Sequence, residues 1–385
     1  MRSEYEIVRY RPDQKRVVAE LQRGLWSPDP AWNTAYLEWK YERNPYVVPP
    51  RIYLALYGTE VVGMRGMFGM NWEVGGPGNT VVGICPDDLV IAPDHRNRGL
   101  ITKIMEVALK DFAEEGYRYV YSLSAGRITR LASLATGWRS AGSMQPQRWH
   151  SRRAEWFRGM RESFQQARFV WRLADRLPYR HWGEKRQPLE ELCNPEGVRP
   201  RKIGSRIAVE GKARAEEMAR LISRIGHDGR IRHVRDENYL SWRYQNPLHR
   251  YLFLYWEEER LEGYLVLQQY LSELSDRLRV NIGDWEGTTP RVLSGLLRGA
   301  SRLGPFADLN IWTATLMAKA KALLREAGFR PVPEGQEGAG VGQSQPCLLV
   351  RSVQDGYPET DWSLDGRWLL DMANWDIRMV YSMQG

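Results

Sequence analysis

The sequence predicts an α+β protein built from two similar domains, and three observations carry that prediction. A motif of aromatic residues occurs twice, and each copy is followed by the same order of helices and strands. Within each copy, strand-like apolar runs alternate with amphipathic, helix-like segments. The chain has 385 residues, of which 43% are hydrophobic, so it is long enough to bury two cores.

The repeated motif is Tyr36-Leu-Glu-Trp39-Lys-Tyr41-Glu-Arg-Asn44-Pro45, which recurs as Tyr239-Leu-Ser-Trp242-Arg-Tyr244-Gln-Asn246-Pro247. Each copy predicts a helix and then a β-hairpin. A later marker also recurs, a helix-ending glycine followed by an aromatic residue, at Gly137-Trp138 and Gly328-Phe329. Matching markers in the same order indicate a duplicated domain.

The first unit predicts the following elements: strand 5–10, helix 13–25, helix 31–43, hairpin strands 51–57 and 61–68, long strand 80–92, helix 100–115, strand 117–124, helix 127–136 and a strand around 142–149. The second unit repeats this order from about Arg206 to Ser352. We therefore expect a domain at 1–150, a basic segment at 151–204, a second domain at 205–353 and a tail at 354–385. Three tryptophans in the tail, Trp362, Trp368 and Trp375, predict that it packs back on a domain.

One segment of the first unit predicts an anion site. An apolar run ends at Pro93, a polar loop carries Arg96, Arg98 and Gly99, and an amphipathic helix begins at once. The start of a helix presents unpaired N–H groups at the positive end of its dipole, which suits a diphosphate. The glycine permits close approach and the arginines add charged donors, so we expect a phosphorylated carrier here.

This loop resembles the acyl-CoA pyrophosphate loop of the GNAT N-acetyltransferase superfamily, Arg/Gln-x-x-Gly-x-Gly/Ala, with Ile101 in place of the last small residue. The resemblance implies two tandem GNAT-like domains, each a mixed, mostly antiparallel twisted sheet flanked by helices, with acetyl-CoA or another acyl-CoA as co-substrate. The implied donor-binding residues are Val90, Ile91, Arg96, Asn97, Arg98, Gly99, Leu100 and Ile101. Val90 or Ile91 contributes only a backbone N–H, which polarises the thioester carbonyl.

The corresponding segment of the second unit is Gly283-Asp-Trp-Glu-Gly-Thr-Thr-Pro290, before a helix expected from Arg291. It has acidic residues where the first unit has arginines, so it should repel a diphosphate. We therefore expect a degenerate second copy that has lost donor binding and shapes the acceptor cleft.

The resemblance also suggests catalytic residues. Asp87 and Asp88, near the start of the strand-like run, are candidate bases, with a solvated pair in a turn as the alternative. The family often has a tyrosine acid four residues before the helix-ending glycine, where this chain has Ser133. Three alternatives remain for protonating the leaving thiolate: Ser133 orders a water that does so, a nearby tyrosine such as Tyr121 or Tyr119 acts as the acid, or bulk solvent supplies the proton.

Tyr36, Trp39 and Trp72 either line the acceptor cleft or belong to the core. Cys85 is expected to be a small buried side chain rather than a nucleophile. Three separated cysteines and six scattered histidines show no metal-ligand spacing, and we expect no metal and a reduced, cytoplasmic protein. No signal peptide or transmembrane run is recognised.

The net charge of +8 is concentrated between Arg148 and Arg186, a segment that contains 11 basic and 4 acidic residues. An amphipathic helix expected at 156–177 either packs as a linker, contacts a membrane or nucleic acid, or steers an anionic donor such as CoA or acyl carrier protein. The sequence as a whole predicts an acyl-CoA-dependent N-acyltransferase, with a primary amine of a small metabolite or amino sugar as acceptor. The alternatives are an acyl-thioester decarboxylase or hydrolase of the same fold, and a non-catalytic basic docking module.

Overall fold

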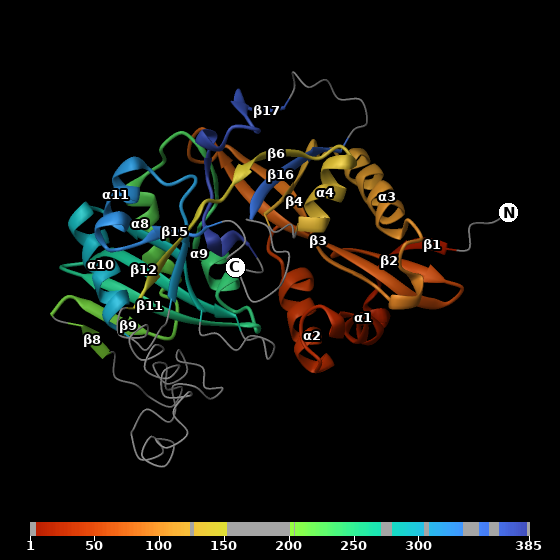
Figure 1. Ribbon diagram of the computed structural model, residues 1–385, viewed down its shortest axis with the longest axis horizontal. Helices are drawn as coiled ribbons and strands as arrows, with labels where there is room; N and C mark the ends of the chain where they lie inside the picture. Colours follow the sequence, from red (N-terminus) through yellow and green to blue (C-terminus); the bar gives the residue numbers. More distant parts are fainter. Residues whose placement is uncertain are drawn as a thin grey trace, which may run out of the picture.

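The expected α+β fold is confirmed: two twisted, mostly antiparallel sheets are flanked by helices (Figure 1). The computed structural model describes residues 5–123, 127–151, 201–203, 205–270, 279–303, 308–333, 346–353 and 362–382. We call the sheet that contains most strands of the first half sheet A, and the other large sheet B.

The first half of the chain contributes β1 (Tyr5–Arg9), η1 (Pro12–Gln14), α1 (Lys15–Leu21), η2 (Gln22–Gly24), α2 (Pro30–Leu37), η3 (Glu38–Glu42), β2 (Arg51–Tyr57), β3 (Glu60–Val74), β4 (Thr80–Ile91), η4 (Pro93–His95), α3 (Leu100–Glu114), β5 (Tyr119–Ser122), α4 (Arg127–Ala135), β6 (Arg139–Ser143) and β7 (Pro146–His150). Most expected elements are present with similar bounds. The helix expected at 13–25 is shorter, because 3-10 turns flank α1 on both sides. The strand expected around 142–149 is in fact two strands, β6 and β7, which belong to different sheets.

The second half contributes β8 (Arg201–Ile203), β9 (Ile207–Glu210), α8 (Ala215–Ile225), β10 (Ile231–His233), α9 (Glu237–Arg243), β11 (His249–Glu257), β12 (Leu261–Tyr270), β13 (Arg279–Gly287), α10 (Pro290–Leu303), β14 (Asp308–Trp312), α11 (Ala318–Glu326), β15 (Arg330–Pro331), β16 (Cys347–Ser352), β17 (Ser363–Leu364), β18 (Arg367–Trp368), η7 (Met372–Asn374), β19 (Trp375–Asp376) and η8 (Met379–Tyr381). From β9 to β16 this order repeats that of β1 to β7, apart from the added strand β10. The duplication inferred from the sequence therefore extends to the structure.

The two halves exchange their last strands. Sheet A runs β6-β16-β5-β4-β3-β2-β1, and the matching part of sheet B runs β15-β7-β14-β13-β12-β11-β9. Strand β16 thus lies between β5 and β6, where Leu349 is opposite both Ser122 and Ser140. Strand β7 lies between β14 and β15, where Trp149 is opposite Leu309. Each of the expected ranges 1–150 and 205–353 therefore contains a strand that belongs to the other half's sheet, β7 and β16 respectively.

Met144 marks the point where the two exchanged strands pass each other. Its N–H donates to the carbonyl of Pro346, just before β16, and its carbonyl accepts from the N–H groups of Thr313 and Ala314, just after β14. The next residue, Gln145, has a φ of 48°. This left-handed residue turns the chain out of sheet A and into sheet B.

The repeated motif forms the centre of the interface between the halves. Trp39 and Trp242 occupy equivalent positions of the motif, and their rings stack with centroids 5.0 Å apart and planes at 12°. The indole N–H of Trp39 donates to the carbonyl of Trp242 at 2.7 Å, and that of Trp242 donates to the carbonyl of Trp39 at 2.8 Å. Such reciprocal contacts are those of an approximate two-fold axis.

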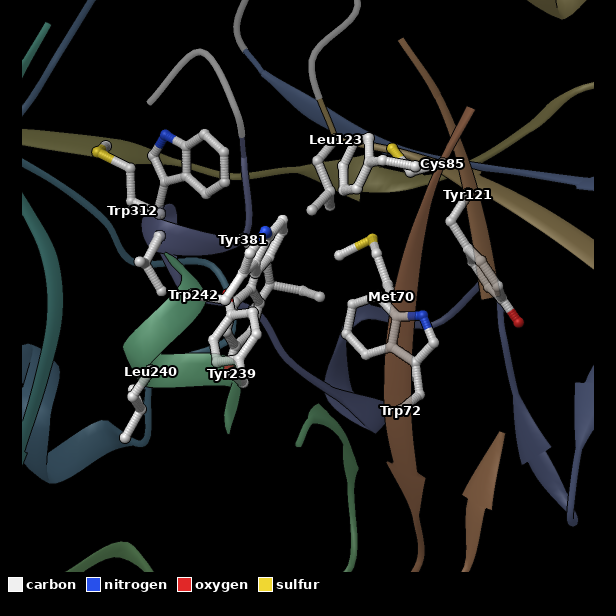
Figure 2. Close-up of a cluster of buried hydrophobic side chains, with 14 of the residues drawn as sticks. Met70, Trp72, Cys85, Tyr121, Leu123, Tyr239, Leu240, Trp242, Trp312 and Tyr381 are labelled. Atoms are coloured by element: carbon white, nitrogen blue, oxygen red, sulfur yellow. The ribbon is translucent and has the colours of Figure 1, made fainter. Parts of the chain in front are cut away.

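The C-terminal tail packs against both halves, as expected for Trp362 and Trp375, whereas Trp368 remains 40% exposed. Trp375 is completely buried, and its ring contacts Trp72 and Tyr121. The Tyr381 ring contacts both Trp72 of β3 and Tyr239 of α9, which are labelled with it in Figure 2. The tail therefore fills the space between sheet A and the second half.

The expected loop at 283–290 is wrong in its extent, because β13 continues to Gly287 and α10 begins at Pro290. Asp284 and Glu286 lie in the strand and pair with Arg235, so they do not face a loop. Only Thr288 and Thr289 connect the two elements, and the Thr289 hydroxyl accepts the N–H of Val292. This helix start already has a cap, which gives a second reason to expect that the second half has no anion site here.

The basic helix expected at 156–177 lies outside the described residues. Within the described ranges, no helix has the length and apolar character needed to cross a bilayer. The same ranges contain no group of three His, Cys, Asp or Glu residues arranged to hold a metal.

Candidate active site

The predicted anion site is the loop between β4 and α3. Asn97 and Gly99 both adopt left-handed backbone angles, with φ values of 60° and 72°, and these two turns allow α3 to begin at Leu100. Arg96, Asn97, Arg98 and Gly99 are all exposed. Leu100 is buried and anchors the helix start, whereas Ile101 is 44% exposed.

The start of α3 is open to a ligand. Gly99 is its N-cap and has no side chain to accept the first helical N–H groups. A Cβ placed on Gly99 would meet nothing within 4 Å, so the space beside this N-cap residue is free of protein. Arg96 donates from Nε to the carbonyl of Ile91 at 3.2 Å, which leaves its outer nitrogens available. Free N–H groups, a helix dipole and two arginines suit a diphosphate.

A narrow cleft lies between β4 and β5. The two strands are parallel and pair only at Ile84 and Val120, after which they diverge. Residues of β3, β4, the end of β5 and the tail line the cleft: Phe68, Cys85, Pro86, Asp87, Ser122, Leu123, Tyr381 and Ser382. Burial raises the pKa of Cys85, which agrees with the expected small buried side chain.

Asp87 and Asp88 lie inside β4, at a β-bulge, and not in a solvated turn. Asp87 is opposite Gly66 and Leu89 is opposite Arg65, so Asp88 is the extra residue, with a φ of 41°. The bulge turns both carboxylates toward one face of the sheet. This face is the one that α2 and η3 cover.

Both carboxylates pair with Lys40, a completely buried residue of η3. The Lys40 Nζ donates to Asp87 at 2.8 Å, to Asp88 at 2.7 Å and to the Tyr36 hydroxyl at 3.1 Å. The Tyr41 hydroxyl donates to the second oxygen of Asp88 at 2.7 Å. Both carboxylate oxygens of Asp88 thus accept a hydrogen bond, whereas Asp87 also borders the cleft.

This cluster contains two carboxyl groups, Asp87 and Asp88, and a single paired cation, Lys40. If both carboxyl groups are ionised, one negative charge is not balanced within the cluster. Burial raises the pKa of Asp88 to about 6, and the charge of Asp87 acts in the same direction, although Lys40 and Tyr41 lower it. Burial alone would lower the pKa of Lys40, but the two carboxylates together raise it. Asp88 is therefore the group of the cluster that takes up a proton near neutrality.

Lys40 was missed by the sequence analysis, although the repeat contained a signal for it. Its counterpart in the second copy is Arg243, which is also completely buried. Arg243 donates to the carbonyls of Val380 and Ser382, at 2.6 and 3.0 Å. The basic residue at this motif position therefore binds the two carboxylates in the first half, and in the second half it binds the C-terminal tail beside the cleft. In both copies of the motif a basic residue stands between a tryptophan and a tyrosine, and this repeated pattern could have indicated its role.

The other candidate catalytic residues lie away from the cleft lining. Tyr121 is buried, its ring packs on Trp72 and Trp375, and burial raises its pKa above the usual value. Ser133 lies in α4 and is half-buried. Neither is among the described residues that line the cleft.

Tyr36, Trp39 and Trp72 are completely buried in the core that joins the two halves. This placement agrees with the core alternative for Trp39 and Trp72, while Tyr36 keeps a link to the cleft through Lys40. Val90 and Ile91 pair with Met64 and Gly63 of β3 at the end of β4.

Comparisons with known proteins agree with this geometry. Residues 12–130 match the acetyltransferase (GNAT) domain family. A GCN5-related N-acetyltransferase from Anabaena variabilis has a similar structure, with a TM-score of 0.55 and 12% identity over 91% of this chain and 73% of that chain. A probable N-acyltransferase from Enterococcus faecalis gives a TM-score of 0.53, with 12% identity over the same shares. A GCN5-related N-acetyltransferase from Kribbella flavida gives 0.50, with 13% identity over 90% and 71%.

No curated protein sequence matches the chain. The family match covers the β4–α3 loop and the cleft residues of β4, and the similar structures share the fold of the whole chain. Residues 12–130 thus match an acetyltransferase (GNAT) domain, and the chain shares the fold of the similar structures over about nine-tenths of its length.

Proposed function

We propose that this protein is an acyl-CoA-dependent N-acyltransferase whose acceptor is a primary amine of a small metabolite or amino sugar. The observation that carries the proposal is the uncapped, exposed start of α3 beside the cleft between β4 and β5. The free, buried cysteines Cys85 and Cys347 support a reduced, cytoplasmic setting.

The residues of the β4–α3 loop fit the diphosphate of CoA. Leu100 and Ile101 offer backbone N–H groups, the space beside Gly99 is open, and Arg96 and Arg98 add positive charge. Bound CoA supplies an activated thioester. The backbone N–H groups of Val90 and Ile91 are the proposed donors to its carbonyl oxygen.

Asp87 is the proposed base, because it alone of the two carboxylates borders the cleft. In the transfer, the amine nitrogen forms a bond to the acyl carbon, the carbon–sulfur bond breaks, and CoA leaves as a thiol. Asp87 takes the proton lost by the amine, and the sulfur gains one from solvent or from a water that Ser133 orders. Tyr121 is not assigned as the acid that protonates the sulfur, because its side chain is buried. Asp88 and Lys40 position Asp87.

The first prediction concerns the donor. Replacing both loop arginines, Arg96→Ala with Arg98→Ala, is expected to weaken acetyl-CoA binding at least 100-fold, because each charged contact contributes roughly 1.5–3 kcal/mol. Calorimetric titration of wild type and variant measures this change. Arg206→Ala is the control, since Arg206 forms an ion pair with Glu258 beside sheet B and its loss should leave binding unchanged. Equal affinities of wild type and double variant would rule out this donor site.

The second prediction concerns the base. Asp87→Asn is expected to lower kcat roughly 100-fold or more and to leave acetyl-CoA affinity within a factor of about two, because general-base catalysis contributes on the order of 10²–10⁴. Release of free thiol with a panel of small amines gives the rate. An unchanged rate in the variant would exclude Asp87 as the base.

A further inference from the structure

A cavity of about 220 Å³ lies in the second half, at the place that corresponds to the donor cleft of the first half. In the repeated element order, β13 and β14 correspond to β4 and β5, and α10 and α11 correspond to α3 and α4. The strands β13 and β14 are likewise parallel, and their pairing ends at Asn281 and Asn310. The end of β13, the starts of α10 and α11, and the tail form most of the cavity lining.

The tail closes the inner part of this second cleft. The Ile377 N–H donates to the hydroxyl of Thr315, just after β14, at 2.9 Å, and that hydroxyl donates to the Ile377 carbonyl at 3.1 Å. The Arg378 Nη1 donates to the carbonyl of Trp285 in β13 at 3.2 Å. The tail thus crosses from one strand to the other and closes the route that a pantetheine arm would take. The remaining space is smaller than the roughly 300–1,000 Å³ of pockets for drug-sized ligands, so it suits a small molecule.

One part of the cavity lining is apolar. It consists of side chains from α10, from α11 and from the turn before α11: Leu293, Leu316, Met317, Ala320 and Leu323. Met317 is 59% exposed, so apolar surface at this cavity is uncovered. Such surface suits an aliphatic group of a ligand.

A cluster of charged residues beside the cavity has one negative charge in excess. Arg378 pairs with Asp376 at 2.9 Å and with Glu286 at 3.1 Å, and Arg235 pairs with Glu286 at 2.6 Å and with Asp284 at 2.9 Å. Burial would raise the pKa of Asp376, but the nearby arginines lower it to about 2, so this carboxylate is ionised. Both guanidinium groups bind the same oxygen of Glu286, Oε1, which leaves its Oε2 free to accept from a ligand.

The other charged residues of the lining are Arg230 and Lys319. Arg230 pairs with Asp228 at 2.6 Å and lies farther from Asp376, at 3.9 Å, so the pair of Arg230 and Asp228 adds no net charge. Lys319 is exposed and forms no ion pair or hydrogen bond with the described part of the chain. It lies in the first turn of α11, whose N-cap Met317 gives no side-chain hydrogen bond. This side of the cavity therefore offers a cation and free N–H groups to a carboxylate.

We propose that this cavity binds an apolar α-amino acid of about the size of leucine. Its ammonium group balances the excess negative charge beside Glu286, its carboxylate accepts from Lys319 and the start of α11, and its side chain packs on the apolar part of the lining. The site is separate from the acyl-transfer cleft and does not depend on the proposed function. The tail connects the two, because Arg378 lines this cavity while Tyr381 and Ser382 line the cleft of the first half.

The test compares three ligands that share one aliphatic group: leucine, 4-methylpentanoate, which lacks the ammonium group, and 3-methylbutylamine, which lacks the carboxylate. Ligand-observed NMR titration of the full chain measures the three dissociation constants. Leucine is expected to bind roughly tenfold more tightly than either analogue, because each analogue lacks one charge-assisted contact. Absence of leucine binding, or equal affinity for all three ligands, would overturn the proposal.

A substitution at the rim tests the carboxylate contact. Lys319→Met is expected to weaken binding of leucine and 4-methylpentanoate roughly tenfold and to leave that of 3-methylbutylamine within about twofold. Arg325→Met is the matched control, since Arg325 is also exposed on α11 but does not line the cavity. Equal losses in the two variants, or a loss of amine binding in Lys319→Met, would contradict the assignment.

Hydrogen exchange locates the bound ligand. Leucine is expected to slow exchange at the start of α11 and in tail residues 375–378, and to leave the start of α3 unchanged. Protection at the start of α3 instead would place the ligand in the first half and would overturn the proposal. Acetyl-CoA binding, measured separately, tests the proposed function, so failure of one assignment does not imply failure of the other.

Discussion

Residues 1–150, expressed alone, are expected not to form a stable domain, although they contain most of sheet A. The fragment lacks β16, which lies between β5 and β6 and contributes Cys347, Leu348, Leu349 and Val350, all completely buried. Loss of one buried leucine costs roughly 2–5 kcal/mol, and whole domains are stable by only about 5–15 kcal/mol. The fragment should therefore lack cooperative thermal unfolding by circular dichroism, and it should not bind acetyl-CoA.

The same exchange can be tested in the full chain by one substitution. Leu349→Ala is expected to cost roughly 2–5 kcal/mol and to speed hydrogen exchange in β5 and β6, although those strands lie about 200 residues earlier in the chain. Leu309→Ala is the matched control, because Leu309 is equally buried but lies in β14 of sheet B. A cooperatively folded fragment, or faster exchange in β14 after Leu349→Ala, would contradict the strand order.

Lys40→Met is expected to destabilise the protein by roughly 3–5 kcal/mol at pH 8, because it leaves Asp87 and Asp88 buried without their cation. The loss should shrink as the pH falls. An ordinary carboxyl group in the unfolded chain has a pKa of about 3.9, whereas that of Asp88 is raised to about 6 even with Lys40 present. Between these values the folded state binds more protons, so its stability increases toward lower pH. Removing Lys40 raises the pKa of Asp88 in the folded state further and extends the upper end of this window.

Urea unfolding at pH 5 and pH 8 measures the effect. Lys15→Met is the control, since Lys15 also bridges two carboxylates, Glu38 and Glu42, but at a partly exposed site. Its loss should cost less than about 1 kcal/mol at both pH values. If Lys40→Met proved as stable as wild type at pH 8, the buried cluster would not have the charges assigned to it.

The parts of the fold that were predictable depend on local sequence. The start of α3 was predicted because Gly99 follows a polar loop and precedes an amphipathic run, and the helix does begin at Leu100. The duplication was predicted because the motif containing Trp39 recurs around Trp242, and the two rings prove to stack on each other. These signals lie within a few residues of the feature that they specify.

The strand exchange was not predictable in this way. An apolar strand such as β7 has the same sequence requirements in either sheet, and the choice depends on contacts of Met144 with Pro346 and Thr313, far away in the chain. The same holds for the site. Asp87 and Asp88 were recognised as candidate acids, but their partner Lys40 lies in a separate helical turn and their bulge depends on pairing with β3.

A crystal structure of the full chain with acetyl-CoA tests the donor site most directly. We expect the diphosphate to accept hydrogen bonds from the backbone N–H groups of Leu100 and Ile101, with Arg96 or Arg98 beside it and the acyl end in the cleft that Asp87 borders. A diphosphate bound elsewhere, or at the start of α10 in the second half, would contradict the assignment of the donor site to the first domain.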